Sequence, residues 1–206
     1  MGLPQEVKRY SPQEYYRLER DAVSKSDYYN GEIFAMAGGT SRHALICGNI
    51  TREVGNLLKG SHCAVYTSDL RLKIKASGLR VYPNVGIYCG PLEFDEEDPY
   101  AETVTNPTLL FEVLSPSTAG YDRGFKSENF RRIPSLRGYV LVSQDKPHVE
   151  IYERQADGSW VLREEDRLDA VVQLPGIAAS LPLADVYDRV SFPDPNAPAR
   201  QAPPQT

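Results

Sequence analysis

The sequence has no apolar stretch of about 18 residues, the length that a membrane-spanning helix needs. Its N-terminus also lacks a basic segment followed by an apolar run and small residues, the pattern of a secretory signal. We therefore expect a cytoplasmic protein without a membrane segment. With 206 residues, 41% of them hydrophobic, the chain can bury one sizeable core. No shift in composition separates two halves, so we predict one domain over residues 1–192.

Cysteine is scarce as well, with only Cys47, Cys63 and Cys89 in the chain. Their number is odd, they lie in apolar stretches, and their spacing is not that of metal ligands. We expect reduced thiols that pack as small hydrophobic side chains.

Positive charge is in deficit, since the net charge of −5 opposes a general attraction to nucleic acid. Residues 93–102 contain six acids and no base, and we expect this run to be a solvated loop. Residues 68–90 and residues 122–146 each carry a net charge of +3. These two stretches are either a local footprint for nucleic acid or scattered surface charge.

Periodicity predicts alternating helices and strands. The capping box Ser11-Pro12-Gln13-Glu14 begins a helix, and Asn30-Gly31 between strand-forming residues predicts a hairpin. Helices are expected over 43–58 and 122–132, and strands over 63–66, 70–74, 81–89, 108–114 and 138–143, with an antiparallel hairpin over 148–164. This order indicates an α/β fold with a mixed central sheet flanked by helices. The proline-rich segment 193–206 is expected to be disordered.

Glu112 lies inside the apolar run TLLFEVL, which is typical of a central strand buried on both faces. Burying a carboxylate there is costly unless it is paired, protonated or bound to a cation. Glu112 is therefore a candidate site residue. A salt bridge to an arginine or exposure at the end of the strand remains the alternative.

Five segments, in this order, carry a resemblance to a known family: YYNGEIFAMAGGTSRH, YTSDLRLKI, YPNVGIYCG, NPTLLFEVLSPST and YDRGFKSENFRRIPSLRGYVLV. Together they resemble the Uma-type restriction endonuclease family, a branch of the PD-(D/E)XK nuclease superfamily, over about residues 10–190. The resemblance implies a restriction-endonuclease-like core, with the N-terminal hairpin and the C-terminal antiparallel hairpin added to it. It also implies cleavage of DNA by a homodimer.

Residue by residue, the resemblance makes Pro83-Asn84 the "PD" of the motif and Glu112 its second acid. Leu114 stands where the motif lysine belongs, and Lys126 on the following helix matches the displaced lysine. Glu32 matches an acid after the hairpin turn. The resemblance implies metal ligation by Glu112, Asn84 and Glu32, and catalysis by these three residues with Lys126. His43 matches a histidine at the start of the long helix, to which the resemblance assigns no role. Asp69, like Glu32, is an acid that could compensate for the uncharged Asn84.

The implied cofactor is Mg²⁺ or Mn²⁺, which prefers carboxylate oxygens and water as ligands. Asn84 departs from the motif because an amide carbonyl can coordinate a metal but carries no charge, so we expect reduced affinity. Three hypotheses follow: a DNA endonuclease, weakened or inactive because of Asn84; an inactive protein of the same fold that binds nucleic acid or a protein partner; and a structural or regulatory homodimer without a nucleic-acid role.

Overall fold

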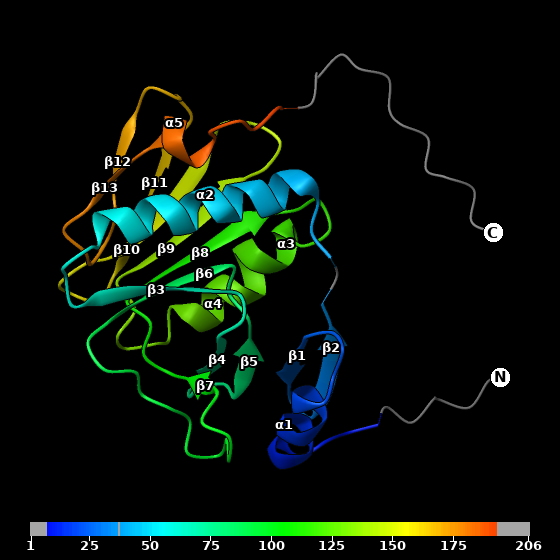
Figure 1. Cartoon of the computed structure of the whole chain (residues 1–206). Helices are drawn as coiled ribbons and strands as arrows, with labels where there is room; N and C mark the ends of the chain where they lie inside the picture. The colour runs from blue at the N-terminus through cyan, green and yellow to red at the C-terminus, as the bar shows by residue number, and fades with distance from the viewer. Residues whose placement is uncertain (1–7, 37, 193–206) are drawn as a thin grey trace, which may run out of the picture.

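A mixed six-stranded sheet forms the centre of the computed structural model, which describes residues 8–36 and 38–192 (Figure 1). The strands, in spatial order, are β11 (Trp160–Glu165), β10 (Val149–Arg154), β9 (Gly138–Ser143), β8 (Leu109–Leu114), β6 (Val85–Cys89) and β3 (Cys63–Thr67). Strands β8 and β9 pair in parallel, and the other neighbours pair antiparallel. All six residues of β8 are buried, as its apolar run predicts for a central strand.

Helices cover both faces of this sheet, which confirms the predicted α/β architecture (Figure 1). On one face α2 (Ser41–Leu57) packs Ile46, Ile50 and Val54 against alternate residues of β8. The other face is covered by α3 (Ala119–Tyr121), the π-helical turn η1 (Asp122–Lys126) and α4 (Ser127–Phe130). The helix expected over 122–132 thus begins earlier, ends at Phe130 and contains a π turn.

A second, five-stranded sheet carries the N-terminal hairpin. Its strands, in spatial order, are β2 (Glu32–Ala35), β1 (Ser26–Tyr29), β5 (Leu79–Val81), β4 (Arg71–Ile74) and β7 (Thr103–Val104). Asn30 and Gly31 both have positive φ, at 48° and 83°, as the predicted two-residue turn requires. Helix α1 (Pro12–Arg20) has the predicted capping box and packs Tyr15 and Tyr16 against Tyr28 of β1.

The strand expected over 81–89, beginning near Pro83, begins two residues later, at Val85. The chain leaves β5 at Val81 and enters β6 at Val85, so Pro83 and Asn84 lie in the gap between the two sheets. Proline has no amide hydrogen for a ladder and prefers strand ends, and this accounts for the interruption. The break places Asn84 beside β8, where it faces Glu112 and Val113.

The C-terminal part of the described chain adds antiparallel pairs. Strands β10 and β11 form the predicted hairpin at one margin of the central sheet. Strands β12 (Val171–Gln173) and β13 (Ser180–Pro182) form a further antiparallel pair, followed by α5 (Leu183–Val186). The segment 193–206, predicted to be disordered, lies outside the described residues. Within 8–36 and 38–192 no helix is long and apolar enough to cross a membrane.

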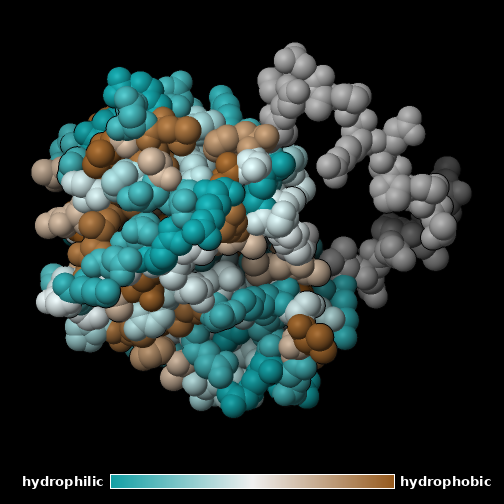
Figure 2. Space-filling model, turned by 45° about the horizontal axis from the view of Figure 1, so that its top comes forward, coloured by the Kyte–Doolittle hydropathy of each residue, from teal (hydrophilic) through white to brown (hydrophobic). Residues whose placement is uncertain are grey.

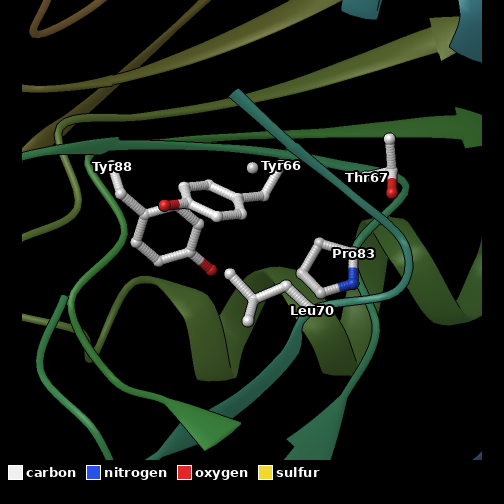
Figure 3. Close-up of a pocket in the computed structure, with 6 residues that line it drawn as sticks. Tyr66, Thr67, Leu70, Pro83 and Tyr88 are labelled. Atoms are coloured by element: carbon white, nitrogen blue, oxygen red, sulfur yellow. The ribbon is translucent and has the colours of Figure 1, made fainter. Parts of the chain in front are cut away.

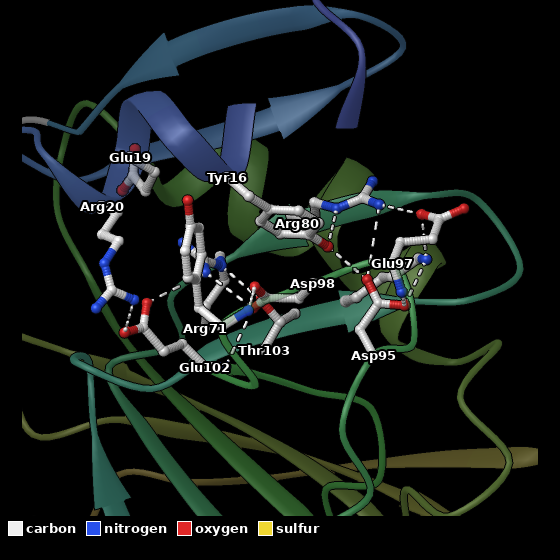
Figure 4. Close-up of polar contacts among 12 residues, drawn as sticks. Tyr16, Glu19, Arg20, Arg71, Arg80, Asp95, Glu97, Asp98, Glu102 and Thr103 are labelled. Carbon is white, nitrogen blue, oxygen red and sulfur yellow. Dashed lines mark hydrogen bonds and ion pairs between the residues drawn. The ribbon is translucent and has the colours of Figure 1, made fainter. Parts of the chain in front are cut away.

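The acidic run 93–102 is a loop, but the expectation that it is solvated is wrong for Asp95 and Asp98, which are 5% exposed. Asp98 accepts from Arg71 Nη2 at 3.1 Å (Figure 4). Asp95 accepts from Lys73 Nζ at 2.7 Å. Arg80, also buried, pairs with both Asp95 and Glu97. The bases of the 68–90 stretch therefore neutralise the loop, because buried charges need partners. Lys75 is the one base of that stretch which stays exposed.

The expectation of reduced thiols is wrong for two of the three cysteines. Cys63 and Cys89 lie opposite each other in the antiparallel β3–β6 pair and form a disulfide. They are 26 residues apart, so their contact depends on the strand register and leaves no pattern in the sequence. Cys47 is free and half-buried on α2.

Candidate active site

Glu112 lies at the centre of the molecule, on the face of β8 that looks toward η1. It is 2% exposed. Its Oε1 accepts from Lys126 Nζ at 2.9 Å, and its Oε2 accepts from the backbone amide of Asn84 at 3.2 Å. The structure thus brings together three of the four site residues predicted from the sequence. Glu112 forms its ion pair with Lys126 and not with an arginine, which was the alternative considered from the sequence.

Asn84 makes hydrogen bonds to two adjacent residues of β8. Its backbone amide donates to the carboxylate of Glu112, and its side-chain Oδ1 accepts from the backbone amide of Val113 at 2.7 Å. The β6–β8 ladder extends only over Val85–Ile87 and Leu109–Phe111, so this side chain satisfies an amide beyond the end of the ladder. The side-chain amide of Asn84 accepts this hydrogen bond without adding a negative charge beside Glu112.

Lys126 is 8% exposed and contacts two carboxylates. Its Nζ lies 2.9 Å from Glu112 Oε1 and 3.1 Å from Asp122 Oδ1, one π-helical turn earlier. Burial by itself disfavours the charged lysine, but Glu112 and Asp122 outweigh that effect and hold the pKa of Lys126 above its usual value. Burial raises the pKa of Glu112 to about 7, and Lys126 limits the rise.

Asp122 and Asp27 are two further carboxylates of this centre that sequence reasoning missed. Asp122 is 2% exposed, and its Oδ1 makes no hydrogen bond within the described residues. Asp27 on β1 also has a buried Oδ1 without such a partner. Burial raises the pKa of Asp27 to about 6, with Lys126 lowering it and Asp122 raising it. Only the i,i+4 spacing of Asp122 to Lys126 was visible in the sequence.

Glu32 lies on β2, directly after the hairpin turn, and is half-buried. Its Oε1 lies 3.4 Å from Arg9 Nη2. Among the described residues no hydrogen bond or ion pair joins Glu32 to Glu112, Asn84 or Lys126. Asp69, the other acid considered, is exposed and pairs with Lys25.

His43 lies in the first turn of α2, with its amide capped by Thr40. Its Nδ1 lies 3.7 Å from Cys47 Sγ. Burial lowers the pKa of His43, while the Asn84 side chain acts in the opposite direction. Burial therefore favours the neutral form of the imidazole.

Aromatic side chains lie next to Lys126. Tyr121 and Phe125 stack with ring centroids 5.6 Å apart, and Tyr29 meets Phe125 edge to face. Lys126 Nζ lies 5.6 Å from the centroid of Tyr121, which is 38% exposed. Tyr121 therefore lies between the buried Lys126 and the solvent.

Two surface hollows are lined by residues outside this centre. A shallow depression next to Pro83, lined also by Tyr66, Leu70 and Tyr88, leaves no space for a water molecule (Figure 3). A second hollow of about 320 Å³ is lined by Asp69, Leu70, Arg71, Tyr82 and Glu102. Neither includes Glu112 or Lys126.

The donor set around Lys126 is chemically suited to a hard divalent cation. Glu112, Asp122 and Asp27 supply carboxylates, and Asn84 supplies an amide carbonyl, all of them oxygen ligands. Lys126 bridges two of the carboxylates, and the three acids do not converge on one point. Elsewhere in the described chain His148, Glu150 and Glu164 bring ligand atoms within 4.8 Å of one another, but Arg123 already holds Glu150.

Comparison with known proteins gives a consistent picture. Residues 12–184 match the model of the family Uma2, described as "Putative restriction endonuclease". Two curated relatives come from Synechocystis sp. (strain ATCC 27184 / PCC 6803 / Kazusa). The uncharacterized protein slr1290 is 32% identical over 184 residues, 89% of this chain and 94% of its own length. The uncharacterized protein sll1609 is 35% identical over 151 residues, 73% of this chain and 84% of its own length.

A solved structure supports the fold. The crystal structure of "a putative nuclease belonging to DUF820" from Anabaena variabilis ATCC 29413 superposes with a TM-score of 0.67. The match covers 84% of this chain and 95% of that chain, at 17% sequence identity. The predicted restriction-endonuclease-like architecture is therefore confirmed as a fold.

Proposed function

This chain belongs to the Uma2 family of "Putative restriction endonucleases", and we propose that it is a metal-dependent endonuclease that hydrolyses phosphodiester bonds of DNA. The family supports the proposed substrate class, and the residues of the site support the proposed chemistry. The observation that carries the proposal is the buried pair of Glu112 and Lys126 on the central sheet, 2.9 Å apart. A carboxylate and a lysine at this position are the parts that remain of the PD-(D/E)XK motif.

The proposed metal is Mg²⁺ or Mn²⁺, held by Glu112 and the Asn84 carbonyl, with Glu32 as the additional acid suggested by the family resemblance. Such an ion lowers the pKa of a bound water and offsets charge on the phosphate. Lys126, with its pKa raised, stays protonated and can stabilise the negative charge that develops on the phosphate. Asn84 brings no charge, so metal affinity and activity are reduced.

Glu32 contributes least to this proposal, because its ion pair is with Arg9. We further propose that the protein acts in the cytoplasm and as a homodimer, since duplex cleavage needs one site per strand. In the view of Figure 2 the hydrophobic patches are separated by hydrophilic surface. If the proposed dimer uses the face shown in Figure 2, its interface is largely polar.

A second candidate function is an inactive member of the fold that binds nucleic acid or regulates a partner. One observation favours inactivity: the Asn84 side chain is engaged by the Val113 amide. Arg71, Lys73 and Arg80 are buried beneath the acidic loop, where they cannot contact a phosphate backbone, and this favours a protein partner over nucleic acid. A structural homodimer without a nucleic-acid role remains the third candidate, and the net charge of −5 favours it.

Cleavage of supercoiled plasmid with Mg²⁺ or Mn²⁺ tests the proposal. The native chain, Glu112→Ala, Asn84→Asp, and Asn84→Asp with Glu112→Ala are compared. Nicking by the native chain that disappears in Glu112→Ala supports an active enzyme. Nicking by Asn84→Asp alone supports a disabled nuclease. If none of the proteins nicks the plasmid and none shifts DNA in a gel at low salt, the nuclease and the binding role are both rejected.

A further inference from the structure

Three residues at one corner of the central sheet carry metal-ligand atoms that lie close together. The imidazole of His62 and the Sγ atoms of Cys63 and Cys89 offer ligand atoms that all lie within 4.8 Å of one another. Strand β3 begins at Cys63, β6 ends at Cys89, and β3 is the edge strand of the sheet. His62 is exposed and both cysteines are half-buried, so solvent reaches this cluster.

The pairing of β3 with β6 holds the two cysteines together whether or not their sulfur atoms are bonded. The antiparallel ladder places Cys63 opposite Cys89 and continues over four further residue pairs. Gly90 donates its amide to the carbonyl of His62 at 2.9 Å, which extends the pairing beyond the cysteines. The cysteines next to this hydrogen-bonded pair occupy a non-hydrogen-bonded pair, in which side chains approach most closely. Reduction therefore leaves two thiols that still face each other.

The imidazole of His62 has no competing side-chain partner in the described part of the chain. Its Nε2 lies 3.9 Å from Cys63 Sγ, and within residues 8–36 and 38–192 the ring makes no ion pair and no other hydrogen bond. Imidazole and thiolate are ligands that suit Zn²⁺, whereas Mg²⁺ and Mn²⁺ prefer oxygen. The cluster therefore differs in chemistry from the carboxylate centre at Glu112.

We propose that His62, Cys63 and Cys89 form a zinc site when the disulfide is reduced, and that the metal then replaces the disulfide as the link between β3 and β6. Thiolates about 2.3 Å from a tetrahedral zinc ion lie about 3.8 Å apart, a separation that the side chains of a cross-strand pair can reach. Two thiolates also balance the charge of the ion. The fourth position of the tetrahedron is open to water or to an incoming ligand.

The exchange between disulfide and zinc site conserves electrons and protons. Reduction by a dithiol breaks the S–S bond, adds two electrons and two protons to the sulfur atoms, and converts the reductant into a disulfide. Binding of Zn²⁺ then forms two Zn–S bonds and one Zn–N bond and releases the two thiol protons to solvent. Oxidation to the disulfide removes both thiolate ligands, so the oxidised chain does not hold the ion.

The test is a titration of the full chain with Co²⁺ and then with Zn²⁺, in the absence of DNA. The chain is first reduced with a phosphine, which does not compete for the metal as a thiol ligand. Co²⁺ bound by thiolates gives a charge-transfer absorption band that carboxylate sites do not give. We expect this band in the reduced native chain, its loss when Zn²⁺ displaces Co²⁺, and no band in the oxidised chain.

Substitutions identify the ligands. Cys63→Ser combined with Cys89→Ser should abolish the band, and Cys47→Ser should leave it unchanged. His62→Ala should weaken Zn²⁺ binding by at least about tenfold, since loss of a residue that only orients a ligand already has that effect. His148→Ala is the matched control, because it removes a histidine from the other cluster of ligand atoms in the described chain.

Thermal unfolding separates metal binding from misfolding. In EDTA the reduced native chain and the double serine variant should have the same Tm, because both lack the disulfide. Zn²⁺ should then raise the Tm of the native chain only. Absence of the band in the reduced native chain, equal binding by the oxidised chain, or unchanged binding in His62→Ala would each overturn the proposal. The proposed endonuclease is judged separately by the plasmid assay, since the zinc site does not depend on it.

Discussion

The side-chain carbonyl of Asn84 accepts a hydrogen bond from the backbone amide of Val113, the residue after Glu112. The position that resembles the first motif acid therefore has a structural task, because it closes the end of the β6–β8 ladder. An aspartate could accept the same hydrogen bond through one oxygen. The departure from the motif thus changes the charge of the site and preserves its geometry.

The first prediction concerns Asn84→Asp. The new carboxylate lies beside Glu112, so we expect lower stability without metal, by about 1 kcal/mol, or a Tm lower by about 2–4 °C. With Mn²⁺ the order should reverse, because a further anionic ligand strengthens metal binding. Thermal unfolding in EDTA and in Mn²⁺ measures both. A variant that is more stable than the native chain in EDTA would contradict the placement of position 84 in an acidic centre.

The second prediction compares the two partners of the buried pair. Lys126→Met leaves Glu112 and Asp122 without their shared cation, and we expect a loss of about 3–5 kcal/mol of unfolding free energy. Glu112→Gln should cost less, about 1–3 kcal/mol, because Lys126 keeps Asp122 as a partner. Urea denaturation gives both values. Equal losses would show that Asp122 does not share the lysine.

The third prediction is a loss of stability in acid that involves the loop 93–102. Burial alone raises the pKa of Asp98, but hydrogen bonds from Thr103 and the Tyr100 amide, together with Arg71, outweigh it and lower the pKa. A lowered pKa means that the native state binds the proton more weakly than the unfolded chain. The stabilisation is therefore complete well above pH 4 and is lost as the pH falls through the native value.

Denaturation measured from about pH 7 down to about pH 2 checks this slope. Asp98→Asn should be less stable at neutral pH and should show a flatter decline in acid. Asp169→Asn, at an 85% exposed side chain, is the control and should follow the native curve. An unchanged slope in Asp98→Asn would rule out the ion pair with Arg71 as the origin of acid sensitivity.

The fourth prediction concerns the Cys63–Cys89 disulfide. It closes a loop of 26 residues, so reduction should lower the unfolding free energy by about 3 kcal/mol. Urea denaturation with and without a thiol reductant measures the difference. Cys47→Ser should respond to the reductant as the native chain does, whereas Cys63→Ser with Cys89→Ser should not respond. In the cytoplasm this disulfide would be exposed to reducing conditions, which favour its reduction to two thiols.

Much of the fold was accessible from the sequence because its signals are local. The capping box at Ser11, the Asn30-Gly31 turn and the apolar run around Glu112 each depend on residues a few positions apart. The strand around Glu112 implied a buried carboxylate, and the family resemblance pointed to Lys126. The comparison that places the chain in the Uma2 family confirms that resemblance.

The tertiary structure alone decided the partners of the charged and sulfur-containing side chains. Asp98 meets Arg71 from 27 residues away, Cys63 meets Cys89 through strand register, and Lys126 of η1 meets Glu112 of β8. Such pairs depend on how strands are ordered and how loops fold back, and periodicity along the chain does not encode that. Charge runs in a sequence therefore describe a surface only after burial and pairing have been determined. In residues 68–90, Arg71, Lys73 and Arg80 are buried and form neither a footprint for nucleic acid nor scattered surface charge.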